Sequence, residues 1–211
     1  QGGPDGGQNG GHEDGFAPDC PFDGTSYTCT RERMDDLQMV RQITFLDGAD
    51  EPMEFYDAME TASIEMIYDL EGTRSGDRVT ATIDRHREKV VTGLEGEEET
   101  RIWNGSGESD VTREMTGDDG ANRSFALSST TLGENVVMPV PTDDDSDRWP
   151  LEGTITKNVE VTITSDGTSE VRTRTVVITF NGTQFADITI DGEAGTIDLA
   201  KRKSGRFARR H

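Results

Sequence analysis

Apolar and polar residues alternate along much of this 211-residue chain, and the alternation constrains its fold more than any other feature. A period of two is typical of β-strands with one buried and one exposed face. It is clearest in residues 64–70 and 79–83, where the polar partners are threonine, aspartate and glutamate. Threonine favours strands although it is polar, so an all-β fold is compatible with a hydrophobic content of only 31%.

The same pattern predicts strands through the rest of the chain. Candidate strands in its middle part are residues 98–103, 109–115, 124–129 and 134–140. One short helix is expected over residues 53–62, where Met53, Phe55, Tyr56 and Met59 show weak helical spacing.

Turn residues predict how the C-terminal strands pair. Asn181-Gly182 is a strong signal for a two-residue hairpin turn, and such a turn places Val177 opposite Ala186. At residues 165–167, a two-residue turn would place Val161 opposite Arg172. A three-residue turn places Val161 opposite Val171 and is preferred here, because it gathers the apolar residues on one face.

The last turn, Asp191-Gly192, leads into a strand over residues 196–200 and places Ile197 opposite Ala186. These registers predict four strands that share one apolar face. Its expected members are Val159, Val161, Ile163, Val171, Val177, Ala186, Ile188, Ile190, Ile197 and Leu199. We therefore expect an antiparallel meander that forms a β-sandwich or an open barrel, with a second sheet from the earlier strands over this face.

Four segments are expected along the chain. Residues 1–19 form a Gly-rich acidic arm, residues 20–52 an opening segment that contains a disulfide, residues 53–200 the antiparallel β-domain, and residues 201–211 a basic tail. The arm and the tail have little apolar surface of their own. We expect neighbouring protein chains to order them.

The two cysteines, Cys20 and Cys29, lie nine positions apart in a turn-rich stretch and are expected to form a disulfide. A disulfide indicates an oxidising compartment. The chain opens with Gln1-Gly2-Gly3, without an initiator methionine, which is typical of a mature end after removal of a signal peptide. We therefore expect an exported protein, periplasmic or extracellular.

The formal net charge of −21 disfavours nucleic acid as a partner, because phosphate backbones are repelled. No apolar stretch approaches the roughly 18 residues of a spanning helix, so no transmembrane segment is expected. The charge is uneven, because the tail is basic and contains no acidic residue. Its candidate interaction residues are Lys201, Arg202, Lys203, Arg206, Arg209 and Arg210.

The C-terminal part resembles known proteins weakly. Residues 149–156, with the sequence WPLEGTIT, precede residues 177–183, VITFNGT, and residues 197–199, IDL. Together these stretches resemble the C-terminal half of exported, β-rich bacterial proteins of unknown function. The resemblance implies a β-rich fold and export, and it transfers no catalytic residue.

The densest carboxylate cluster, Asp143, Asp145 and Asp147, has the spacing of the first three ligands of a calcium loop. The sixth position is Arg148 and the twelfth is Thr154, so the loop is not an EF-hand. Two alternatives remain at this stage, an irregular calcium loop and a solvated acidic turn. Apart from this calcium candidate, no cofactor is expected.

Catalytic motifs are not found in the sequence, and His86 is expected to be an exposed imidazole at a charged strand end. Two glycosylation sequons, at Asn104 and Asn181, are Asn-Gly pairs at expected hairpin turns, and a third begins at Asn122.

The leading hypothesis is a non-catalytic structural or interaction subunit of an extracellular or periplasmic assembly, whose partners are copies of itself or a membrane complex. The alternatives are an extrinsic periplasmic subunit that stabilises a membrane complex, and a calcium-dependent adhesin or glycan-binding module.

Overall fold

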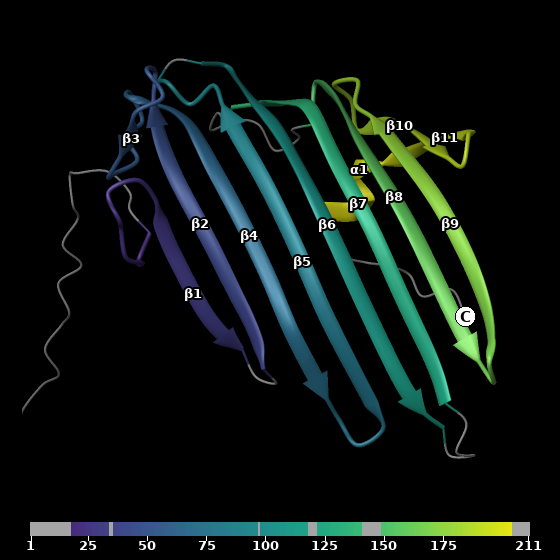
Figure 1. Cartoon of the computed structure of the whole chain (residues 1–211). Coiled ribbons are helices and arrows are strands. Elements are labelled where there is room, and N and C mark those ends of the chain that lie inside the picture. Colours follow the sequence, from purple (N-terminus) through teal and green to yellow (C-terminus); the bar gives the residue numbers. More distant parts are fainter. Residues whose placement is uncertain (1–17, 34–35, 97, 118–121, 141–148, 204–211) are drawn as a thin grey trace, which may run out of the picture.

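The computed structural model describes residues 18–33, 36–96, 98–117, 122–140 and 149–203. These residues form one antiparallel sheet, which confirms the expected all-β meander (Figure 1). The strands are β1 (Tyr27–Arg33), β2 (Leu37–Asp47), β3 (Pro52–Met53), β4 (Thr61–Ser75), β5 (Val79–Thr92), β6 (Thr100–Thr116), β7 (Asn122–Pro139), β8 (Glu152–Ser165), β9 (Thr168–Thr179), β10 (Phe185–Ile190) and β11 (Glu193–Asp198). One short helix, α1 (Leu199–Lys203), follows β11.

The strands lie in the order β1-β2-β4-β5-β6-β7-β8-β9-β10-β11, and β3 pairs with β2 beside this path. The expectation of a second sheet over the C-terminal meander was therefore wrong for the described residues, since the earlier strands extend the same sheet. Figure 1 shows β5 to β8 as its long central strands. Because β2 pairs with β4, the sheet also runs across the expected boundary between residues 52 and 53.

The central strands are longer than the sequence predicted. Residues 98–103 and 109–115 fall largely into one strand, β6, and residues 124–129 and 134–140 fall largely into β7. The predicted turn at Asn104-Gly105 was wrong, because the pairing of β6 with β7 continues past it with a bulge between Trp103 and Gly105. A glycine inside a strand often marks such a bulge.

The helix predicted for residues 53–62 was also wrong. Met53 ends β3, and the carboxylate of Asp57 accepts hydrogen bonds from the backbone amides of Met59 (2.7 Å) and Glu60 (3.2 Å). Aspartate side chains that bond the following backbone amides stabilise turns in competition with helix. Tyr56 instead packs its ring at 6.0 Å from the ring of Phe45.

The preferred register of β8 and β9 was wrong by one residue. Ser165 pairs with Thr168, so the turn has two residues, and Val161 lies opposite Arg172 instead of Val171. Both turn residues have positive φ, 53° at Asp166 and 76° at Gly167. That geometry defines a type I′ turn, whose twist matches the flanking strands.

The predicted pairing of Val177 with Ala186 was wrong as well, because Val177 lies opposite Thr189. The loop between β9 and β10 is longer than two residues and is bonded to the start of β8. Phe180 donates its amide to the carbonyl of Gly153 (3.0 Å), and Gly182 donates to that of Pro150 (3.0 Å). These bonds hold Asn181-Gly182 against the chain that enters β8.

As a result, Val171 and Val177 leave the predicted apolar face, and Val176 and Ile178 take their place. The next turn was predicted correctly, since Ile197 lies opposite Ala186. The expected strand over residues 196–200 ends at Asp198, and the chain continues as α1.

A small core lies at the β1 side of the sheet. Tyr27, Ile43 and Phe45 are buried together, and the hydroxyl of Tyr27 donates a hydrogen bond to the carbonyl of Glu54. The expected disulfide between Cys20 and Cys29 is formed, with the two Cα atoms 5.2 Å apart. It closes the turn that leads into β1, next to this core.

Among the described residues, no helix is long and apolar enough to span a membrane.

We predict that Phe45→Ala lowers the free energy of unfolding by about 3 to 5 kcal/mol, because it removes a side chain that is only 2% exposed from this core. Urea denaturation followed by circular dichroism measures the change. Phe185→Ala is the matched control, since Phe185 is 50% exposed and we expect a loss within about 0.5 kcal/mol. Equal losses in the two variants would contradict the assignment of the core.

Candidate functional site

The two faces of the sheet differ in chemistry. Residues directly opposite each other in an antiparallel pair lie on the same face, so the registers assign each strand residue to a face. One face, here called the apolar–basic face, carries most of the large apolar side chains of the strands. It includes the buried residues Tyr27, Ile43, Phe45, Val91, Val111, Val136, Ile178 and Ala186.

Lysine and arginine also gather on this face. Every lysine or arginine side chain that the structure describes within a strand lies there. These residues are Arg31, Arg41, Arg74, Arg85, Arg87, Lys89, Arg101, Arg113, Arg123, Lys157, Arg172 and Arg174.

The opposite face, here called the acidic face, is rich in threonine, serine and carboxylates. The carboxylates in the regular parts of β4 to β8 all lie on it. They are Glu65, Asp69, Glu71, Asp84, Glu88, Glu108, Asp110, Glu114, Glu134 and Glu160. A chain with a net charge of −21 thus keeps one sheet face basic.

A hollow of about 650 Å³ lies on the apolar–basic face over β5 to β8. Three glycines form its floor. Gly105 of β6 lies opposite Gly133 of β7, and Gly107 follows Gly105 on the same face. Because glycine has no side chain, the backbone itself is the bottom of the hollow at these positions.

The walls of the hollow combine cations with apolar groups. Arg85, Arg87 and Lys89 line one side from β5, and Lys157 lines the other side from β8. Apolar lining comes from Trp103, Leu127, Val136 and Ile155. Its volume is within the range of small-molecule sites, about 300 to 1,000 Å³.

The cations of the hollow lack carboxylate partners within the described part of the chain. Arg85 donates from Nε to the hydroxyl of Ser109 at 3.1 Å, and Lys89 Nζ lies 3.2 Å from the ring centroid of Trp103. Burial lowers the pKa of Lys89, because the ammonium is partly removed from water. The hollow is therefore a cluster of positive charge in which Lys89 is partly desolvated.

Other arginines of the same face are paired. Arg172 donates to Glu170 at 2.8 Å, and Arg174 lies 3.6 Å from the carboxylate of Asp191. Some cations of this face thus have carboxylate partners, whereas the four in the hollow have none among the described residues.

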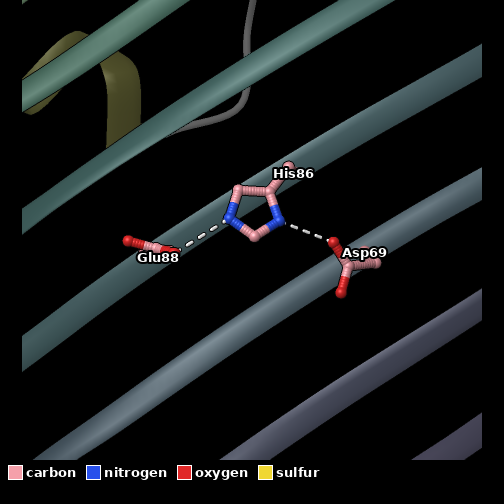
Figure 2. A network of polar contacts seen from close by, with 3 residues as sticks. All are labelled: Asp69, His86 and Glu88. Carbon is pink, nitrogen blue, oxygen red and sulfur yellow. Dashed lines mark hydrogen bonds and ion pairs between the residues drawn. The ribbon is translucent and has the colours of Figure 1, made fainter.

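His86 lies on the acidic face, between two carboxylates (Figure 2). Its Nδ1 is 2.7 Å from Asp69 of the neighbouring strand β4, and its Nε2 is 3.1 Å from Glu88 of its own strand. The hydrogen bond to Asp69, followed by that to Glu88, raises the pKa of His86 above 6.5. The sequence missed this arrangement, because Asp69 is adjacent only through the pairing of β4 with β5.

Several residues singled out in the sequence are not among those that the structure describes. Asp143, Asp145 and Asp147 lie outside the described residues, as do Arg206, Arg209 and Arg210. Lys201 of α1 lies 3.6 Å from Asp198 of its own chain, and Arg202 and Lys203 follow it in the helix. Within the described ranges, no three histidine, cysteine or acidic side chains are placed to hold a metal ion.

The sequence did contain a signal for the hollow. Arg85, Arg87 and Lys89 alternate on one strand, and Gly105 and Gly107 alternate on the next. This spacing places the cations on one face and the glycines on one face, but only the register of β5 with β6 shows that the two sets are adjacent.

Comparison with protein-family models, characterised proteins and solved structures finds no match to this chain.

We predict that His86 titrates with a midpoint above 6.5, because both ring nitrogens face carboxylates. A histidine whose pKa is raised by folding stabilises the folded state. This stabilisation is fully present at a pH below the pKa of the unfolded chain, about 6.5, and is lost as the pH rises through the pKa of the folded chain. Since His86, Asp69 and Glu88 are well exposed, we expect this contribution to the free energy of unfolding to be about 0.2 to 1 kcal/mol.

Proton NMR of the imidazole measures the midpoint, and His86→Gln assigns the signal among the three histidines. Asp69→Asn should lower the midpoint more than Glu88→Gln does, since Asp69 has the larger influence. A midpoint at or below 6.5 in the unaltered chain would contradict the geometry.

Proposed function

We propose that this protein is a non-catalytic binding subunit of an exported assembly, and that its binding surface is the apolar–basic face. The observation that carries the proposal is the segregation of the sheet. Apolar residues share one face with the cations of the hollow, which have no carboxylate partners in the described chain, and no second sheet of the described strands covers that face.

A partner that covers this face would gain in two ways. Burial of apolar surface is favourable by about 25 cal/mol per Å². A partner with negative charge would also supply the counter-charges that the hollow lacks in the described chain. The expected partner is therefore negatively charged and partly apolar.

The environment of His86 supports a non-catalytic role. A general base needs a ring nitrogen that is free to accept a proton. Both nitrogens of His86 face carboxylates, which favours the doubly protonated ring. When protonated, the ring relieves repulsion between Asp69 and Glu88 on the acidic face.

Export and assembly belong to the proposal as well. The disulfide between Cys20 and Cys29 supports an oxidising compartment outside the cytoplasm. The basic tail, with Lys201, Arg202, Lys203, Arg206, Arg209 and Arg210, and the acidic arm are proposed to contact neighbouring chains of the assembly.

A fluorescent dye that is both apolar and anionic, anilinonaphthalene sulfonate, tests the choice of face. We expect it to bind the full chain with an increase in fluorescence. Leu127→Thr removes an apolar wall of the hollow and should weaken dye binding by about fivefold, the equivalent of about 1 kcal/mol.

Leu132→Thr is the matched control, because Leu132 is a leucine of the same strand on the acidic face and is 46% exposed. It should leave dye binding unchanged. Equal weakening by both substitutions, or no dye binding at all, would refute the apolar–basic face as the binding surface.

A further inference from the structure

We propose that the hollow binds the headgroup of a single anionic amphiphile, a molecule with a phosphate or carboxylate head and an alkyl chain. This inference rests on the proposed function and names the partner of the same face. It follows from the shape of the hollow, its charge and the apolar residues that lie beyond it on the same face.

The head would lie over the glycine floor. Across the sheet, Arg87, Gly107, Thr131 and Lys157 form one row of directly paired residues, and Lys89, Gly105, Gly133 and Ile155 form the next. Arg87 and Lys157 form the two ends of the first row, and Lys89 borders the glycines at one end of the second. An anion seated on the floor would therefore lie between positive groups of β5 and β8, with Thr131 as a hydroxyl donor.

Side chains in place of the floor glycines would fill the hollow. A Cβ atom on Gly105 would lie 2.5 Å from the carbonyl oxygen of Glu88, closer than real Cβ contacts allow. At Gly133 the nearest atom would be 3.7 Å away, an ordinary contact. A larger residue at position 133 would thus fill the hollow without a backbone clash at its Cβ.

The alkyl chain would cross the row of Arg85, Ser109, Ser129 and Val159 and lie along the apolar residues beyond it on the same face. Ile83, Val111, Leu127 and Val161 form a row of directly paired residues, four positions beyond the row of Gly107 along β6. At about 3.3 Å per residue, this row lies about 13 Å from that of Gly107. Phe125 and Ile163 continue the apolar surface.

Other ligand classes match the hollow less well. A free inorganic anion would leave Leu127, and Ile83 and Val161 of the same row, uncovered. A neutral sugar would leave the cations without counter-charges. The acidic face of a second copy also offers carboxylates. These are spread over a sheet of regularly spaced strands, and such a surface does not fit into a hollow whose floor is backbone.

Isothermal titration calorimetry with decyl phosphate, below its micelle concentration, tests the proposal on the full chain. Decyl phosphate should bind at one site per chain. Inorganic phosphate, which has the head alone, and decyl maltoside, which has the chain with a neutral head, should each bind at least tenfold more weakly.

Two pairs of variants locate the site. Gly133→Leu should weaken binding of decyl phosphate at least tenfold, whereas Ala126→Leu, on the acidic face of the same strand, should not change it. The double variant Arg87→Gln with Lys157→Gln should also weaken it at least tenfold. The control with the same charge change, Arg172→Gln with Arg174→Gln, alters arginines that have carboxylate partners and should change it less than twofold.

NMR of the Trp103 indole provides a measurement that does not depend on the folding of Gly133→Leu. Its signal, assigned by Trp103→Phe, should shift as decyl phosphate is added to the unaltered chain. The inference is overturned if this signal does not shift, if decyl maltoside binds as tightly, or if Gly133→Leu and Ala126→Leu, both folded, bind equally.

The dye experiment separates the two proposals. Dye binding that depends on Leu127, together with no binding of decyl phosphate, would overturn the amphiphile and leave the face as a binding surface for an acidic protein. Absence of both would overturn the proposed function as well.

Discussion

The register of the antiparallel pairs is the constraint on which the rest of this structure depends. Side chains alternate between the faces of a strand, so a slip of one residue moves every side chain of that strand to the other face. In β4 to β8 the registers place the cations on one face and the carboxylates of the regular segments on the other. The hollow and its charge exist only in these registers.

This separation of charge helps to explain how a single sheet with a small core can be stable. Long cationic side chains cover apolar surface with their aliphatic stems and keep their charged ends near water. Lys89, half-buried against Trp103, is an example. Carboxylates and threonines, whose side chains are shorter, occupy the acidic face. There the β-propensity of threonine and the hydration of the carboxylates are enough to maintain the strands. A sheet built in this way has two chemically different faces, and each face can contact a different kind of partner.

Much of the fold could be predicted from the sequence, because alternation specifies a strand without reference to its neighbours. The all-β antiparallel meander, the disulfide and the turn at Asp191-Gly192 follow from local patterns. The errors arose where a distant contact decides. The loop at Asn181 is held by bonds to Gly153 and Pro150, and Asn104-Gly105 lies in a bulge between two partner strands.

The site was harder to predict for the same reason. Arg85, Arg87 and Lys89 are recognisable as alternating cations, but the glycines beneath the hollow come from β6 and β7. At β8 and β9, the preference for a face made only of apolar residues selected the wrong register. The structure instead places Val161 opposite Arg172, so apolar and basic residues share the face.

The central claim is that register separates the charges, and interstrand backbone contacts between protons test it most directly. In the full, isotope-labelled chain, NMR should show contacts that place Val161 opposite Arg172 and Gly105 opposite Gly133. Contacts that place Val161 opposite Val171 would move Arg172 and Arg174 to the other face, and a slip at Gly105 would remove the floor of the hollow. Either result would contradict the account.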